Sequence, residues 1–257
     1  MSALSKEFRE IFDNFRKLDF KVTYIFLSIA IITLISICFA STGFYYDNIG
    51  KDRFDSRIYW FLMDGSLMFI LPVLSIKFIF KQKLSEYGLQ VGNLKYGVIT
   101  TLIFLFFMVI IVWIVSGSEA FANAYPQGGS KVKESVIIFV LYELAIAYYM
   151  LGWEFFWRGY TLFGLLPKFG WYAIFIQMIP FFILHKGKPE LELFGSILAG
   201  IILGVQAIRA RSFIYAWIIH ASVMVVVDGF SVLRSNIGVY GISISDFFKI
   251  ITSIFRI

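Results

Sequence analysis

Five ionisable side chains lie within or at the ends of strongly apolar stretches in the second half of this chain: Glu154, Arg158, His185, His220 and Asp228. An ionisable group inside the hydrocarbon of a membrane costs about 2.5–3.5 kcal/mol on insertion scales, so such groups are usually paired or functional. His185 and His220 are the only two histidines of the protein. Their presence in the same half as an acid and an arginine predicts a polar cavity for catalysis or transport.

A glutamate and a histidine that face one water molecule can remove its proton, and a second imidazole or an amide can stabilise the oxyanion that forms. Such a set would hydrolyse an amide bond. Glu154 and Arg158 are four residues apart and therefore share one face of a helix. A buried ion pair that only fixes helix packing is the structural alternative for these two residues.

The depth of each group follows from the helical rise. At ~1.5 Å per residue from one membrane face, Glu154 lies at ~16 Å, His220 at ~13 Å, His185 at ~22 Å and Asp228 at ~24 Å. All four fall inside a hydrocarbon slab of about 30 Å. We therefore expect Glu154 to lie level with His220, and His185 level with Asp228.

A metal is a second way to activate water, because His185, His220, Glu154 and Asp228 are all residue types that bind zinc. The chain has no His-Glu-x-x-His spacing, so we assign no cofactor and no metal ligand, and keep a divalent metal such as zinc as an alternative. Cys38 is the single cysteine. It excludes an intramolecular disulfide and a thiolate zinc site, and it lies too early in the chain to act as nucleophile with the histidines.

The composition indicates which elements must position these residues. Of 257 residues, 59% are hydrophobic and 16% charged, with a mean hydropathy of +0.80, whereas soluble domains carry about 25% charged residues. A spanning helix needs about 20 apolar residues, and the candidates are 22–41, 58–80, 96–116, 135–165, 170–185, 191–208, 212–230 and, more weakly, 238–256. We predict an all-α polytopic transmembrane bundle of seven or eight spans, one integral domain over 1–257, with the catalytic core in the C-terminal half.

Basic residues set the expected orientation. They are dense before the first span and after the second, and sparser elsewhere, which favours a cytoplasmic N-terminus. Residues 1–21 are predicted to form a cytoplasmic amphipathic segment. The net charge of +6 fits this pattern, and no aromatic-interleaved basic patch indicates nucleic acid. Asp64, beside Gly65, is interpreted as an interfacial residue at a flexible turn.

Three motifs occur in order in the second half. "WEFFWRG" contains Glu154, Arg158 and Gly159; "FFILH" contains Phe181 and His185; "HASVMVVVD" begins with His220. Together they resemble the motifs of the CPBP (CAAX protease and bacteriocin-processing, or Abi) family of intramembrane proteases. The similarity covers roughly residues 85–230, which form the expected CPBP-like core.

The resemblance implies an intramembrane endopeptidase of the glutamate or metal-dependent type. Glu154, helped by His185, would activate water; His220, supported by Asp228 or a nearby amide, would stabilise the oxyanion; Arg158 would orient and charge-balance Glu154. The implied partners are a hydrophobic or prenylated peptide substrate and the lipid bilayer. The implied location is the plasma (inner) membrane of a bacterium.

Two positions depart from the family motifs. Trp153 stands where the first glutamate of the motif is expected, and Met224 where an asparagine or aspartate is expected, the next acid being Asp228. A non-catalytic immunity or scaffold protein with the same cavity is therefore an alternative, and it predicts binding without cleavage. A proton-coupled transporter is a third hypothesis, although the interrupted helix pairs of inverted repeats are not evident.

Overall fold

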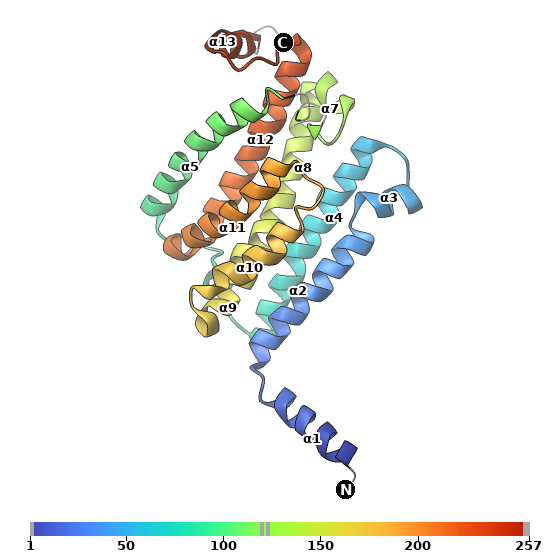
Figure 1. Cartoon of the computed structure of the whole chain (residues 1–257), viewed down its shortest axis with the longest axis vertical. Coiled ribbons are helices and arrows are strands. Elements are labelled where there is room, and N and C mark those ends of the chain that lie inside the picture. Colours follow the sequence, from blue (N-terminus) through green and yellow to red (C-terminus); the bar gives the residue numbers. More distant parts are fainter. Residues whose placement is uncertain (1–2, 119–120, 122–123, 254–257) are drawn as a thin grey trace.

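The computed structural model of the chain describes residues 3–118, 121 and 124–253, and in this part of the protein every regular element is a helix (Figure 1). The α-helices are α1 (Ala3–Arg16), α2 (Phe20–Phe39), α3 (Thr42–Asn48), α4 (Arg53–Leu74), α5 (Leu94–Val115), α7 (Ser130–Glu134), α8 (Val136–Glu154), α9 (Leu162–Phe169), α10 (Tyr172–Ile183), α11 (Glu190–Ala210), α12 (Ile214–Ile237) and α13 (Ile244–Ser253). Two π-helical turns, η1 (Ser75–Phe80) and η3 (Phe155–Thr161), and one 3₁₀ turn, η2 (Leu84–Tyr87), complete the elements.

Six helical segments of the described chain are long and apolar enough to cross a membrane: Phe20–Phe39, Arg53–Phe80, Leu94–Val115, Val136–Phe169, Glu190–Ala210 and Ile214–Ile237. These confirm the predicted all-α membrane bundle. Two of the eight predicted spans are shorter: α10 has 12 residues and α13 has 10, which is less than the roughly 20 needed to span. The described chain therefore has six candidate spans and one shorter apolar helix, roughly consistent with the seven or eight spans predicted, and is an integral membrane protein.

Short polar residues fix where the long helices begin. Asp19, Asp52, Asn93 and Ser135 each accept a hydrogen bond from the backbone N–H three residues later, as N-cap residues of α2, α4, α5 and α8. Each cap satisfies an amide that would otherwise be unpaired at the helix end. These caps thus fix the N-terminal ends of four of the six candidate spans.

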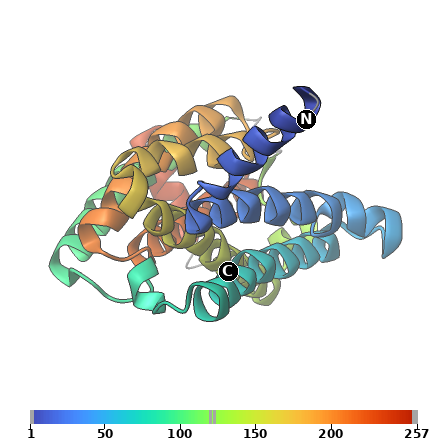
Figure 2. The same cartoon turned by 90° about the horizontal axis from the view of Figure 1, so that it is seen from below.

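Helix α8 lies at the centre of the bundle, with α2 and α4 on one side and α5, α11 and α12 on the other (Figures 1 and 2). Its contact with α4 is close because two glycines meet: a Cβ at Gly152 would lie 2.1 Å from the carbonyl oxygen of Gly65. The indole N–H of Trp217 in α12 donates to the carbonyl of Ala147 in α8 at 2.8 Å. Small residues and such interhelical bonds hold helices together in lipid.

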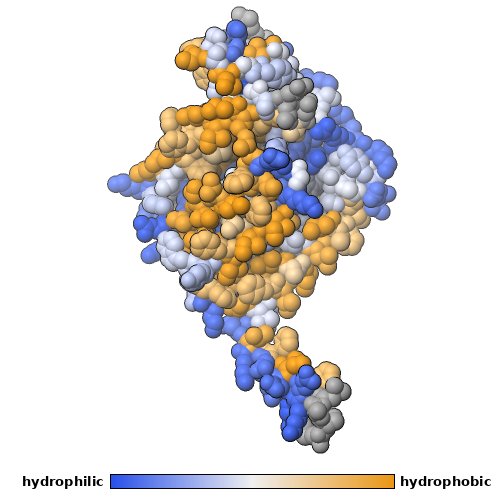
Figure 3. Space-filling model, viewed as in Figure 1, coloured by the Kyte–Doolittle hydropathy of each residue, from blue (hydrophilic) through white to orange (hydrophobic). Residues whose placement is uncertain are grey.

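Apolar side chains cover most of the visible face of the bundle, between more polar ends (Figure 3). Exposed examples include Leu102 and Phe106 on α5 and Val136 and Ile137 on α8. In water such a surface would be a large interaction patch. On six apolar helices it is the surface that faces lipid.

Asp64 differs from its prediction. It lies inside α4 rather than at a turn, its side chain is buried, and the indole N–H of Trp60 donates to its Oδ2 at 3.3 Å. The neighbouring Gly65 is not a hinge; a Cβ there would lie 2.9 Å from the Cα of Tyr149. Close helix packing, not chain flexibility, accounts for the glycine.

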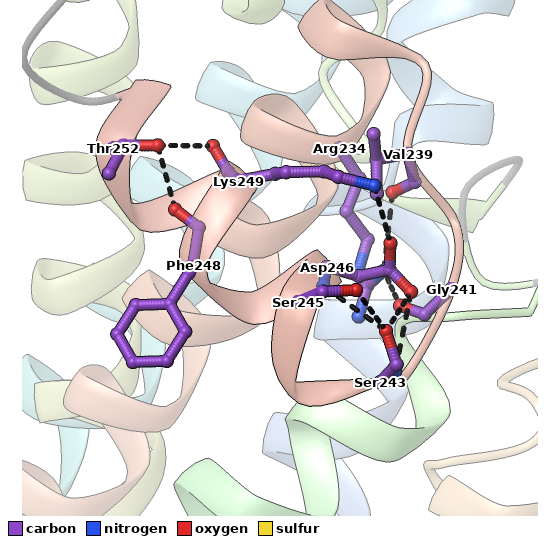
Figure 4. A network of polar contacts seen from close by, with 9 residues as sticks. All are labelled: Arg234, Val239, Gly241, Ser243, Ser245, Asp246, Phe248, Lys249 and Thr252. Carbon is purple, nitrogen blue, oxygen red and sulfur yellow. Dashed lines mark hydrogen bonds and ion pairs between the residues drawn. The ribbon is translucent and has the colours of Figure 1, made fainter.

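A buried arginine closes the end of the bundle that carries α13 (Figure 4). Arg234 donates to Ser116 Oγ and to the carbonyls of Trp113, Val239 and Gly241, at 2.8–3.2 Å. These acceptors belong to the end of α5 and to the connection between α12 and α13. One side chain of α12 therefore bonds to the end of α5 and to the connection that leads to α13.

Candidate functional site

The centre of the site is the transition from α8 into the π-helical turn η3. Glu154 is the last residue of α8, and all seven residues of η3, including Arg158, are buried. Gly159 lets the chain of η2 approach, since a Cβ there would lie 3.1 Å from the carbonyl oxygen of Tyr87 and 2.6 Å from the ring of Phe155. π-Helical turns inside α-helices are frequent at functional sites.

One oxygen of Glu154 carries two contacts. Its Oε1 accepts hydrogen bonds from His220 Nδ1 at 2.7 Å and from Arg158 Nη1 at 3.1 Å. Glu154 and Arg158 have no exposed side-chain surface, whereas the His220 side chain is 18% exposed. Glu154 Oε2 and Arg158 Nε and Nη2 have no hydrogen-bond partner among the described residues. Glu154 and His220 thus lie level, as the depth estimate predicted.

The contact with Glu154 fixes the tautomer of His220. A carboxylate only accepts, so Nδ1 must carry the proton that it donates to Oε1. The neutral imidazole then has its lone pair on Nε2. His220 therefore combines an oriented ring, a free basic nitrogen and partial exposure.

His185 has a similar arrangement on the other side of an aromatic wall. It follows α10, and its Nδ1 lies 2.7 Å from the carbonyl oxygen of Phe181, so Nδ1–H donates and Nε2 is again free. The Phe181 ring lies 4.6 Å from the His185 ring and 6.4 Å from the His220 ring, measured between centroids. The Arg158 guanidinium lies 3.9 Å from the centroid of the same ring. Phe181 thus contacts all three polar residues.

Trp153 forms the second part of this wall. Its ring packs against those of His185, Phe181 and Trp157 with centroids 5.6–6.0 Å apart. Sequence reasoning identified Trp153 only as a departure from a motif. The signal it missed is the local density of aromatic residues, "WEFFW", which predicts rings packed around Glu154.

Asp228 lies apart from Glu154. It is eight residues beyond His220 in the continuous helix α12, about 12 Å along the axis. Its carboxyl group lies beside that of Glu143 in α8, and both side chains are buried. Met224, between His220 and Asp228, packs against apolar core residues. The structure therefore places Asp228 in a separate acidic pair, not beside His220.

The described residues contain no group of three or more His, Cys, Asp or Glu side chains arranged to hold a metal ion. The carboxylate of Glu154 is already bonded to Arg158 and His220, and Asp228 lies about 12 Å from His220 along α12. The residues present do not form a zinc-binding set, and we derive no step through a metal.

Residues 133–226 match the family model described as type II CAAX prenyl endopeptidase Rce1-like. Over these residues the chain is similar to the Rce1-like family. The match confirms the resemblance to CPBP proteases that the motifs indicated. The Rce1-like region contains Glu154, Arg158, His185 and His220, and ends two residues before Asp228. No curated protein and no solved structure matched the chain.

Proposed function

We propose that this protein is an intramembrane endopeptidase in which His220 activates the water and Glu154 orients His220. The observation that carries this proposal is the 2.7 Å contact between Glu154 Oε1 and His220 Nδ1, which leaves Nε2 as a free base. A buried carboxylate that holds an imidazole in one tautomer is the arrangement of the Asp–His pair in serine proteases. The Rce1-like region supports peptide-bond hydrolysis as the reaction class.

The roles differ from those expected from the motifs, where Glu154 activates water. Glu154 has no exposed surface, and one of its oxygens is occupied by Arg158 and His220. His220 is the more accessible of the pair. Glu154 is therefore assigned to positioning and charge balance, and His220 to the contact with water.

The reaction follows from this assignment. The water oxygen attacks the carbonyl carbon of the peptide bond while its proton passes to His220 Nε2. Glu154 stabilises the imidazolium that forms, as in the serine protease pair. The tetrahedral intermediate then collapses, the C–N bond breaks, and His220 returns the proton to the departing amine. Arg158, 3.1 Å from Glu154 Oε1, supplies a positive charge beside the carboxylate in the buried site.

The proposed substrate is a hydrophobic or prenylated peptide that reaches the site from the bilayer. His185 and Phe181 would border the bound peptide next to His220, because the Phe181 ring contacts both imidazoles. The large apolar surface of the bundle supports a substrate that partitions into lipid.

The test is peptide cleavage by the full-length protein in lipid vesicles, with prenylated and unprenylated forms of one hydrophobic peptide. We expect Glu154→Gln and His220→Ala each to lower kcat about 10²–10⁴-fold, the usual range for a lost acid–base group or its orienting partner. Gly195→Ala is the control, because a Cβ there meets no atom within 4 Å. Cleavage by either site variant at the parent rate, with its melting temperature unchanged, contradicts the assignment.

A second candidate function is a non-catalytic peptide-binding protein of the same family. Trp153 in place of the first motif glutamate, packed against His185, is the observation that favours it. It predicts that the parent binds the peptide without cleaving it and that Glu154→Gln leaves the dissociation constant unchanged. Peptide binding and product formation measured in the same vesicles separate the two functions.

A further inference from the structure

Helix α1 presents an apolar stripe that remains largely exposed in the described chain. Phe8, Ile11, Phe12 and Phe15 follow the spacing of one helix face, and their side chains are 49–68% exposed. Figure 3 shows apolar and polar side chains gathered on different sides of this helix at the lower end of the molecule. Three exposed phenylalanines on one stripe require a partner surface.

The opposite side of α1 is polar. A shallow cleft on this side is lined by Lys6, Arg9, Glu10, Asp13, Asn14 and Lys17. Arg16 lies at the border of the two sides, with its guanidinium carbon 4.8 Å from the centroid of the Phe12 ring. Long basic side chains can cover apolar surface in this way while their charged ends reach water or lipid headgroups.

The connection to α2 limits where α1 can lie. Only residues 17–19 separate α1 from α2, the first candidate span, and Asp19 caps that span. Three residues extend at most about 11 Å. Figure 1 shows α1 leaving the bundle directly from the end of α2. The C-terminal end of α1 is therefore held at the surface of the membrane that α2 crosses.

Basic side chains gather at this same end of the bundle. Lys21 is the second residue of α2, and its Nζ donates a hydrogen bond to Gln82 Oε1 at 2.9 Å. Nearby are Lys77 in η1, and Lys81 and Lys83 in the connection from η1 to η2. Clusters of lysine and arginine beside a spanning helix attract anionic lipid headgroups.

We propose that α1 lies flat in the bilayer interface as an anchor that binds anionic phospholipids. Phe8, Ile11, Phe12 and Phe15 insert among the upper acyl segments, and Lys6, Arg9, Arg16 and Lys17 contact the phosphates. This surface is separate from the Glu154 site and goes beyond the proposed protease activity. An amphipathic helix with aromatic residues on one side and charged residues on the other is the usual form of an interfacial anchor, and over residues 6–17 the four basic side chains outnumber the acidic Glu7, Glu10 and Asp13.

The test measures the depth of two sites on opposite sides of α1 in the full-length protein. Cys38→Ser removes the single cysteine, and Phe12→Cys or Glu10→Cys then carries one spin label. Two collision rates are measured for each label: one with oxygen, which concentrates in lipid, and one with a nickel chelate, which stays in water. Their quotient is the oxygen-to-nickel ratio. In nanodiscs of phosphatidylglycerol and phosphatidylcholine we expect the oxygen-to-nickel ratio to be about threefold or more higher at position 12 than at position 10.

The lipid charge is the second variable. In nanodiscs of phosphatidylcholine alone the ratio at position 12 should fall by about half or more, because the headgroup attraction is lost. Equal oxygen-to-nickel ratios at positions 10 and 12 would overturn the interfacial placement. The same ratio at position 12 in both lipid compositions would overturn the binding of anionic lipids. Dipolar broadening between labels at position 12 would instead show that α1 pairs with a second copy, and also contradicts the proposal.

Discussion

The indole ring of Trp153 lies edge-on to the imidazole of His185, with centroids 5.9 Å apart and planes at 72°. The CPBP motif expects a glutamate at this position. A carboxylate here would be a second acid beside His185, whereas the tryptophan supplies a rigid apolar wall that also contacts Tyr149 and Phe181. An apolar ring, and not an ionisable group, therefore packs next to one of the two histidines.

Replacement of Trp153 tests how much this wall contributes. Trp153→Ala should lower the free energy of unfolding by about 3–5 kcal/mol, the usual cost of deleting a buried tryptophan. Trp153→Phe keeps a ring against His185 and should lose less than half as much. Thermal unfolding in detergent micelles measures both variants. Equal melting temperatures for Trp153→Ala and the parent would mean that the indole contributes nothing to the packing.

The sequence allowed the Glu154–His220 contact to be anticipated because both residues lie in regular helices. Counting the axial rise along α8 and α12 places them at the same depth, and the two atoms are 2.7 Å apart. The same count does not extend reliably along α10 to His185. α10 ends at Ile183, so His185 lies in a turn where the rise per residue no longer applies.

Local sequence could not determine which helices pack closely. The pair "DG" at Asp64 and Gly65 is typical of a turn in water, yet both residues lie inside α4. The glycine is explained only by the neighbouring α8, whose Gly152 approaches it from a position 87 residues later in the chain. A close approach between distant segments leaves no periodic signal in a single sequence. The six spans, in contrast, could be predicted because the length of an apolar run is visible in consecutive residues.

Gly152 should tolerate no side chain. Its Cβ would lie 2.1 Å from the carbonyl oxygen of Gly65, a backbone atom that cannot move aside without separating α4 from α8. We expect Gly152→Ala to destabilise the protein by about 2 kcal/mol or more, within the range for overpacking a core. Gly195→Ala, where a Cβ meets no atom within 4 Å, should be neutral or slightly stabilising. Unfolding in detergent compares the two alanine variants, and similar melting temperatures would contradict the close α4–α8 contact.

The acidic pair of Glu143 and Asp228 should limit stability rather than support catalysis. Two adjacent buried carboxyl groups cannot both ionise without repulsion, and apart from each other they have no hydrogen-bond partner among the described residues. Asp228→Asn removes one charge and supplies an N–H donor to Glu143, so the unfolding free energy should rise by about 1–3 kcal/mol.

Asp228→Ala, which supplies no donor, is the control and should gain less. Peptide cleavage by Asp228→Asn should stay within about threefold of the parent, because Asp228 lies about 12 Å from His220 along α12 and does not contact Glu154 or His220. If Asp228→Asn lost as much cleavage activity as is expected for His220→Ala, Asp228 would have to be assigned to the active site.

The attachment of α13 should depend on pH. Ser243 donates its hydroxyl to Asp246 at 2.6 Å and its backbone N–H at 3.3 Å, and Lys249 lies 3.4 Å away (Figure 4). The hydrogen bond from Ser243, supported by Lys249, lowers the pKa of Asp246 below its ordinary value of 3.8. Because the folded-state pKa is the lower one, the cap contributes fully above pH 3.8 and is lost as the pH falls through the folded-state value. The protection of the α13 amides from hydrogen exchange, measured relative to the intrinsic rate, should therefore be constant from pH 8 to about pH 5 and fall in stronger acid.

Asp246→Asn is the control, because it removes the titrating group. In this variant α13 should be less protected at neutral pH, and its protection should show no further drop in acid. An identical drop in the variant would assign the transition to another group.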